Sequence, residues 1–251
     1  DQWVFVDPRR LQRVLDRRGR TLTSGEALRA AVSGTLVVDG LSTEVDTVGW
    51  LEDLRQRLAV QDRDIKPATQ PAALAGHLRD YQLQGLQWMT QLVDLGLGGI
   101  LADDMGLGKT VQILALLAME KERGATRAPA LVVAPTSLME NWRREARKFA
   151  PALKVLVLHG LGRKQLFDSI AEHDLVMTTY PLIARDREVL LSRHWHMAIL
   201  DEAQVIKNPV AATSRWLRDI KAEHRFCLTG TPMENHLGEL WALMRFLDPD
   251  L

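Results

Sequence analysis

Six short apolar runs recur between residues 99 and 228, and longer segments with helical periodicity separate them. The runs are Gly99–Ala102, Ala130–Ala134, Lys154–Leu158, Asp174–Thr178, Met197–Asp201 and Arg225–Leu228. Strands that are apolar on both faces are typical of a parallel sheet, because helices cover such a sheet on both sides. The sequence therefore predicts an α/β fold, and ligands bind such folds at the carboxyl ends of the strands.

The first apolar run leads into a glycine-rich turn and then into an apolar helical segment. The turn reads Asp103-Asp104-Met105-Gly106-Leu107-Gly108-Lys109-Thr110. Gly106 and Gly108 permit backbone conformations in which successive N–H groups point at one anion, and the next helix adds its positive N-terminal end. Lys109 can then reach the outer phosphates of a nucleotide, while the Thr110 hydroxyl can hold Mg²⁺. The strict phosphate-loop pattern has glycine at the position of Asp103, so a plain glycine turn before a helix is the alternative.

Two adjacent carboxylates, Asp201 and Glu202, end the fifth apolar run. A carboxylate inside a strand that is buried on both faces is costly without a partner. Beside a phosphate loop, Asp201 would hold Mg²⁺, usually through water because this ion keeps part of its hydration shell. Glu202 would orient or deprotonate the water that attacks the terminal phosphate. The alternative is a strand that ends in solvated acids.

An amphipathic helix is predicted over residues 78–95, and its apolar arc contains one polar residue, Gln82. An amide on an apolar face needs hydrogen-bond partners, and the edge of a purine offers a donor–acceptor pair for it. The same amide could equally cap a backbone group.

Hydroxyl residues follow two further strand ends. Ser137 and Glu140 have capping-box spacing, which predicts a helix that begins at Ser137 and could bind a nucleic-acid phosphate. A plain helix cap explains that pattern as well. After the last run, Thr229-Gly230-Thr231 could link the nucleotide site to a neighbouring groove, although an ordinary turn uses the same residues.

Composition restricts the partners and the compartment. The 251 residues include 32 Lys and Arg and 32 Asp and Glu, so no overall basic field attracts nucleic acid, and any such binding would use a local patch. The single cysteine, Cys227, excludes an intramolecular disulfide and fits a reducing compartment. Because no apolar segment approaches the length of a membrane span and no signal peptide opens the chain, we expect a cytoplasmic protein that does not contact membranes.

Three regions are predicted along the chain. Residues 1–65 alternate short strand and helix patterns and read as a small α+β unit without recognisable chemistry, followed by a proline-containing linker at 66–76. Residues 77–251 contain all the motifs above. The chain begins at Asp1 without methionine, so we expect a piece of a longer polypeptide.

Taken together, the motif segments resemble the SWI/SNF-type ATPases, which are helicase-like DNA translocases of superfamily two. They stand in the family's order over about residues 77–249, and the stretch from Thr231 to Leu247 is similar to bacterial members. The segments that carry the resemblance are Leu78–Gln82, Asp103–Thr110, Val133–Leu138, Thr178–Tyr180, Asp201–Gln204 with Ile206–Pro209, and Leu228–Asn235.

The resemblance implies that residues 77–251 form the first RecA-like lobe of a two-lobe motor. It assigns adenine to Gln82, the nucleotide to the loop from Asp104 to Thr110, and metal binding and hydrolysis to Asp201 with Glu202. Segments that would follow the DNA backbone or couple it to ATP contain Thr136, Ser137, Thr178, Thr179, Thr229, Gly230 and Thr231. Gln204 stands where related helicases often have histidine, which leaves its coupling contact less defined.

The implied motor binds ATP, Mg²⁺ and double-stranded DNA, and it could displace a protein partner from DNA. Its second lobe, which supplies arginine fingers in this family, lies outside the sequence. An arginine finger contributes about 10³–10⁵ in rate, so we expect this chain to bind ATP–Mg²⁺ and hydrolyse it very slowly. An RNA helicase of the same superfamily and a nucleotide-binding scaffold without turnover are the alternatives.

Overall fold

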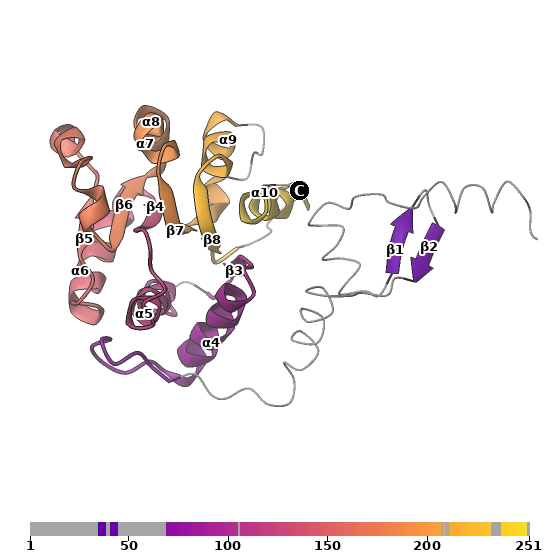
Figure 1. Cartoon of the computed structure of the whole chain (residues 1–251), viewed down its shortest axis with the longest axis horizontal. Coiled ribbons are helices and arrows are strands. Elements are labelled where there is room, and N and C mark those ends of the chain that lie inside the picture. Colours follow the sequence, from indigo (N-terminus) through magenta and orange to yellow (C-terminus); the bar gives the residue numbers. More distant parts are fainter. Residues whose placement is uncertain are drawn as a thin grey trace, which may run out of the picture. The chain divides into compact units, whose positions relative to one another are not determined.

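The computed structural model describes residues 35–38, 41–44, 69–104, 106–206, 208, 211–231 and 237–249 (Figure 1). The chain divides into two compact units, one of residues 1–64 with Asp250 and one of residues 65–249 with Leu251. In the first unit the described residues are the strands β1 (Thr35–Val38) and β2 (Leu41–Glu44), which pair antiparallel. The rest of the α+β unit predicted for residues 1–65 lies outside the described residues.

The second unit contains one sheet of six strands, all parallel to their neighbours, in the order β3-β8-β7-β4-β6-β5. The strands are β3 (Gly99–Leu101), β4 (Ala130–Ala134), β5 (Val155–Val157), β6 (Leu175–Thr179), β7 (His194–Leu200) and β8 (Lys221–Leu228). Each contains most of one predicted apolar run, so the predicted α/β fold with a parallel sheet is confirmed. Both β7 and β8 begin earlier than predicted, because their first residues are polar and interrupt the apolar pattern.

Helices cover both faces of this sheet (Figure 1). One face packs against α4 (Asp80–Asp94), α5 (Lys109–Glu122) and α6 (Met139–Phe149). The other face packs against α7 (Tyr180–Arg185), α8 (Arg187–Leu191), α9 (Ala212–Arg218) and α10 (Leu237–Leu247). Short 3₁₀ turns are η1 (Thr136–Leu138), η2 (Leu161–Leu166), η3 (Ile170–Glu172) and η4 (Ala203–Ile206).

The strand residues alternate between two hydrophobic cores. On β8, Phe226 and Leu228 belong to the core under α4, α5 and α6, whereas Cys227 between them belongs to the opposite core. This is the two-residue period of a strand with both faces buried. The central helix α5 is buried on nearly every side from Val111 to Ala118, as expected for a helix that is apolar all round.

Residues 69–76, the described part of the linker predicted at 66–76, pack against the rest of the lobe. Leu74 is buried, the N–H of Ala75 donates to the carbonyl of Phe149 at 2.7 Å, and the N–H of Leu78 donates to the Gln70 side chain at 2.8 Å. Residues 69–78 therefore pack on the lobe and lead directly into α4. Among the described residues, none of the helices has the length and apolar character that crossing a membrane requires.

Candidate functional site

The predicted motifs meet at one edge of the sheet. Parallel pairing places Leu101 of β3 opposite Leu228 of β8, and Leu200 of β7 opposite Cys227 of β8. Since the carboxyl ends of parallel strands share an edge, the glycine-rich loop after β3 and the acids after β7 lie on the same side of the lobe. The charge of Lys109 also acts on the carboxyl of Asp201.

The glycine-rich loop has the backbone that its two glycines predict. Gly106 and Gly108 have φ angles of 84° and 82°, and Gly108 is the residue that precedes the first turn of α5. The Lys109 ammonium turns back onto the loop, where it donates to the carbonyls of Asp103 at 2.7 Å and Asp104 at 3.1 Å. Thr110 is half-buried in the first turn of α5, whose leading N–H groups have no acceptor within the helix. Met105 lies outside the described residues.

Gln82 lies against this loop. Its Nε2 donates to the carbonyl of Leu107 at 3.0 Å, and its Oε1 accepts from the N–H of Arg79 at 3.0 Å. Gly108 has a φ of 82°, which favours glycine, and a Cβ there would lie 2.5 Å from Gln82 Nε2, so the glycine also leaves room for this amide. The amide therefore binds two backbone groups, as the capping alternative predicted, and it does so beside the loop. Its contact with adenine stays a prediction.

A second glutamine, Gln112, holds the start of the loop, and sequence reasoning missed it. This side chain on α5 is fully buried, and its Nε2 donates to Oδ2 of Asp103 at 2.9 Å. Gly85 on α4 leaves room for the Gln112 side chain, since a Cβ at position 85 would lie 1.9 Å from Gln112 Oε1. Asp103, which departs from the strict phosphate-loop pattern, thus has a defined partner. Gln112 is a polar residue in an otherwise apolar stretch, and this was the signal in the sequence that could have identified it.

Asp201 is 6% exposed and both of its carboxylate oxygens accept hydrogen bonds. Oδ2 accepts from the indole Nε1 of Trp142 at 2.7 Å, and Oδ1 accepts from the N–H of Glu202 at 2.9 Å. The Tyr180 hydroxyl donates to the Asp201 carbonyl at 2.7 Å, which fixes the backbone of the same residue. Trp142 is thus both a fully buried residue of α6 and a hydrogen-bond donor to this acid.

Burial raises the pKa of the Asp201 carboxyl above its ordinary value. The hydrogen bond from Trp142 and the charge of Lys109 act in the opposite direction without cancelling the effect of burial. A partly desolvated carboxylate gains from a nearby cation. With the hydroxyl of Thr110 and the carboxylate of Glu202 at the same edge, the donors are all oxygens, which is the set that Mg²⁺ prefers. The residues present therefore fit this ion.

A chain of hydrogen bonds connects Glu202 to the end of β8. Gln204 Nε2 donates to Glu202 Oε2 at 2.5 Å, and Gln204 Oε1 accepts from the Thr229 hydroxyl at 2.8 Å. The same hydroxyl accepts from the N–H of Thr231 at 3.1 Å. Glu202 has a φ of 48°, the one positive value outside glycine in the described part of the chain. Three of the predicted coupling residues are thus physically joined to the predicted hydrolytic acid, and Gly230 lies between the two threonines.

The remaining predicted DNA contacts differ in exposure. Thr136 and Ser137 are exposed at the end of β4, but the predicted capping box is wrong. The chain forms the 3₁₀ turn η1 there, α6 begins only at Met139, and its N-terminal residue makes no side-chain cap. The Glu140 carboxylate instead lies 3.7 Å from the Arg143 guanidinium, three residues further along α6.

Thr178 and Thr179 at the end of β6 are 0% and 1% exposed. Their side chains point into the lobe as it stands and are closed to a direct contact with DNA. Several residues of the motif segments lie outside the described residues, namely Met105, Lys207, Pro209 and Pro232–Asn235.

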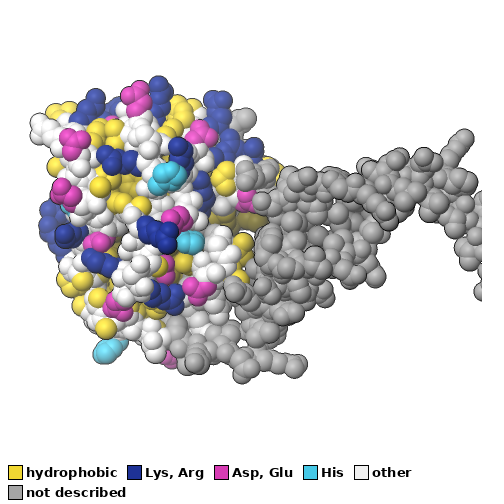
Figure 2. Space-filling view, in the orientation of Figure 1, with side chains coloured by type: hydrophobic (Ala, Val, Ile, Leu, Met, Phe, Trp, Pro, Cys, Tyr) yellow, Lys and Arg dark blue, Asp and Glu magenta, His cyan; other side chains and the backbone are white. Residues whose placement is uncertain are grey.

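The described face of the lobe in Figure 2 carries Lys and Arg side chains interspersed with Asp and Glu. This mixture agrees with the equal numbers of basic and acidic residues in the sequence. What the site offers chemically is a backbone cradle with a positive helix end, a lysine, and two acids. Such a set suits a nucleotide phosphate with its metal ion.

Comparison with known proteins agrees with this geometry. The family model described as SNF2-related domain matches residues 81–251. The chain is 36% identical to YwqA of Bacillus subtilis (strain 168), which carries the provisional name ATP-dependent helicase/translocase; the alignment covers 98% of this chain and 29% of that protein. It is 42% identical to the ISWI chromatin-remodeling complex ATPase ISW2 of Saccharomyces cerevisiae, covering 70% of this chain and 16% of the relative.

Among solved structures, the Sulfolobus solfataricus SWI2/SNF2 ATPase core in complex with dsDNA superposes with a TM-score of 0.69 at 38% identity. That match covers 74% of this chain and 38% of the archaeal one. A second solved structure, the Sulfolobus solfataricus SWI2/SNF2 ATPase core domain, gives a TM-score of 0.65 at 37% identity. This chain thus spans well under half the length of each of these relatives. Because the family model covers more than two thirds of the chain, the chain belongs to the SNF2-related domain family.

Proposed function

We propose that this chain is the ATP-binding lobe of a DNA-dependent ATPase that moves along duplex DNA. The observation that carries the proposal is the convergence of Lys109, Asp201 and Glu202 at one sheet edge, with the charge of Lys109 acting on Asp201. The archaeal SWI2/SNF2 ATPase core that it resembles has been solved with double-stranded DNA, which supports duplex DNA as the partner.

In this proposal each side chain has one task. The loop from Asp104 to Thr110 binds the phosphates, and Gln82 recognises the adenine edge after releasing its backbone partners. Thr110 and Asp201 hold Mg²⁺, which when bound supplies positive charge to neutralise the phosphates. Glu202 orients the attacking water. Lys109 must exchange the two carbonyls of the loop for phosphate oxygens, which provides its ammonium with stronger, charge-assisted hydrogen bonds.

The hydrogen-bonded chain Glu202–Gln204–Thr229–Thr231 supplies a route from hydrolysis to the DNA-facing edge. A change in the position of Glu202 when the terminal phosphate leaves would shift Gln204 and then the end of β8. Thr136 and Ser137 are exposed at the same edge, as is Thr231, so their hydroxyls are available to the DNA backbone. A second RecA-like lobe of the same polypeptide, acting in the cytoplasm, completes the motor in this proposal.

Calorimetry with Mg·ATP tests the nucleotide site directly in the 251-residue chain. We expect the wild-type chain to bind Mg·ATP, Lys109→Ala to abolish binding, and Lys164→Ala to leave it unchanged, because Lys164 is exposed on η2. Circular dichroism of each variant separates loss of binding from loss of fold. Equal affinity in the wild-type and Lys109→Ala chains would refute the loop assignment.

Turnover tests the two-lobe part of the proposal. The 251-residue chain should hydrolyse ATP about 10³–10⁵ times more slowly than a longer polypeptide that includes the second lobe, because the arginine fingers are missing. Duplex DNA should stimulate the longer polypeptide more than duplex RNA does. Brisk DNA-stimulated turnover by the 251-residue chain contradicts the two-lobe requirement, and stronger stimulation by RNA favours the RNA-helicase alternative.

A further inference from the structure

A polar cluster lies at the edge of the sheet opposite the nucleotide site, where β7 and β8 begin and α5 ends. His196 stands five residues before Asp201 on β7, which is roughly 16 Å along a strand. Glu120 stands eleven residues after Lys109 on α5, again roughly 16 Å along a helix. The cluster is therefore separate from the phosphate loop, although the same elements connect the two.

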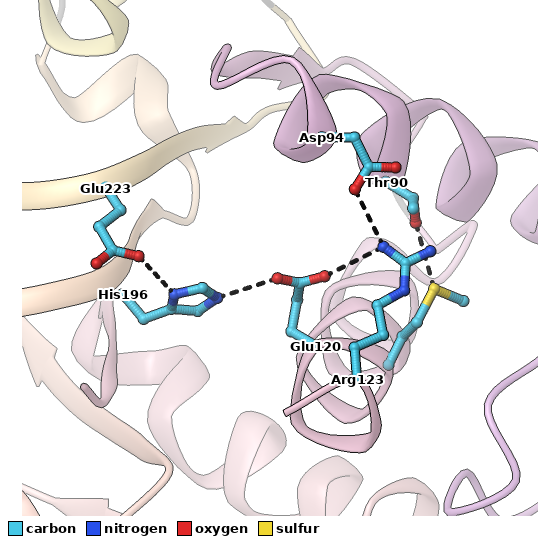
Figure 3. A network of polar contacts seen from close by, with 7 residues as sticks. Thr90, Asp94, Glu120, Arg123, His196 and Glu223 are labelled. Carbon is cyan, nitrogen blue, oxygen red and sulfur yellow. Dashed lines mark hydrogen bonds and ion pairs between the residues drawn. The ribbon is translucent and has the colours of Figure 1, made fainter. Parts of the chain in front are cut away.

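His196 is the centre of this cluster and is 2% exposed (Figure 3). Its Nδ1 lies 3.0 Å from Glu223 Oε2, and its Nε2 lies 3.3 Å from Glu120 Oε2. Glu120 is itself 2% exposed. Arg123 holds the other oxygen of Glu120 at 3.5 Å and reaches Asp94 on α4 at 3.2 Å. One ring nitrogen of His196 thus lies beside a buried carboxylate that Arg123 also contacts, and the other lies beside a carboxylate that is half exposed.

His224 completes the cluster. Its ring lies edge-on to that of His196, with 5.4 Å between centroids, and its Nδ1 atom is buried without a hydrogen-bond partner among the described residues. One ligand atom from each of His196, Glu223 and His224 lies within 4.8 Å of the others. These side chains line a cleft of about 510 Å³ together with Asp94, Glu120 and Arg123. His196 Nε2 is likewise buried without a hydrogen bond among the described residues, and buried polar atoms of this kind require explanation.

We propose that His196, Glu223 and His224 bind a divalent cation of the Zn²⁺ type. Two imidazoles and one carboxylate are a common three-ligand set for zinc, with the fourth position left to water or an exogenous ligand. The imidazoles disfavour Mg²⁺ and Ca²⁺, which select oxygen donors. The three ligand atoms lie within 4.8 Å of one another, and His196 Nδ1 and Glu223 Oε2 are 3.0 Å apart. The Glu223 side chain is 53% exposed, so a cation from solvent can reach this side of the set.

Glu120 supports this assignment as the outer partner of a ligand. Histidines that bind metals usually donate their second ring N–H to a carboxylate, which fixes the tautomer and the ring. Glu120 Oε2 lies 3.3 Å from Nε2, so in the tautomer that carries its proton on Nε2 the lone pair of Nδ1, 3.0 Å from Glu223 Oε2, would be available to a cation bound between them. Arg123 and Asp94 then hold Glu120 in turn. Metal binding would fasten α5, β7 and β8 at the edge opposite the nucleotide site.

Zinc titration of the metal-free 251-residue chain tests the proposal, with calorimetry in the absence of nucleotide. We expect one equivalent of zinc per chain. Glu120→Gln, which removes the outer carboxylate charge, should weaken binding about 10–100-fold, and His224→Ala should weaken it further because a ligand is lost. His194→Ala is the matched control, since His194 is an exposed histidine on the same strand and should change neither affinity nor stoichiometry.

Cobalt supplies a second readout that a purely structural role would not change. Co²⁺ bound by the wild-type chain should show the visible absorption of a four-coordinate site, and His224→Asn, a less disruptive substitution, should lose it while circular dichroism remains native. Absence of zinc binding by the wild-type chain overturns the proposal. Equal weakening in His224→Ala and His194→Ala also overturns it, because binding would then come from surface histidines in general.

Discussion

The indole of Trp142 on α6 and the carboxylate of Asp201 after β7 form a 2.7 Å hydrogen bond although 59 residues separate them in the chain. Trp142 is fully buried, so no water replaces it as a donor. The bond orients an acid that the proposed function assigns to the metal ion. It also connects the helix after β4 to the carboxyl edge of the sheet.

Trp142→Phe should therefore weaken both stability and Mg·ATP binding. Phenylalanine keeps most of the apolar contact but leaves one buried carboxylate oxygen without its donor, which should lower the free energy of unfolding by about 1–3 kcal/mol. Urea denaturation and calorimetry measure the two effects. Trp241→Phe is the control, because Trp241 is 49% exposed on α10. Equal losses in both variants would show that ring size alone matters.

Gly85→Ala should destabilise the lobe, against the usual effect in a helix. Alanine in a helix interior is ordinarily favoured over glycine by about 1 kcal/mol. At position 85, however, the new methyl would meet Gln112 Oε1 at 1.9 Å and displace the amide that holds Asp103. Overpacking of this kind costs about 1–3 kcal/mol. Thermal denaturation shows whether the midpoint temperature falls or rises. Gly238→Ala is the control, because the position of a Cβ on Gly238 of α10 is open, and this variant should not be destabilised.

Arg225→Met should strongly destabilise the core that α7, α8, α9 and α10 cover. The buried guanidinium on β8 donates to the carbonyls of Phe246 at 3.1 Å and Arg218 at 3.2 Å, so it satisfies the ends of two helices. Methionine has a similar length but no donors, and unsatisfied buried carbonyls cost about 1–3 kcal/mol. Arg215→Met, on the exposed face of α9, is the comparison. Identical urea midpoints for the two variants would contradict this role.

Cys227 should resist alkylation until the lobe unfolds. The thiol, on β8, is fully buried in the core that α7 to α10 cover, and burial raises its pKa, so almost no reactive thiolate forms at pH 8. Iodoacetamide labelling followed by mass spectrometry should therefore track unfolding in urea. Labelling of the native chain at the rate of an unfolded control would show that this strand opens under native conditions.

The sheet could be predicted because each strand is apolar on both faces and each helix has its own period, so local sequence contains the signal. The loop from Asp103 to Thr110 was equally readable, since positive φ angles at Gly106 and Gly108 follow from the residues themselves. The early starts of β7 and β8 were not predicted, because segments such as Lys221–His224 are polar and partly exposed.

What the sequence by itself determined was the α/β architecture and the residues gathered at the carboxyl edge, because parallel strands bring all their ends together. What only the tertiary structure decided was the set of partners. Asp103 with Gln112, Asp201 with Trp142, and His196 with Glu120 and Glu223 are contacts between separate elements. Periodicity tells which face of an element is buried, whereas the pairing of two buried polar groups depends on how helices and strands pack.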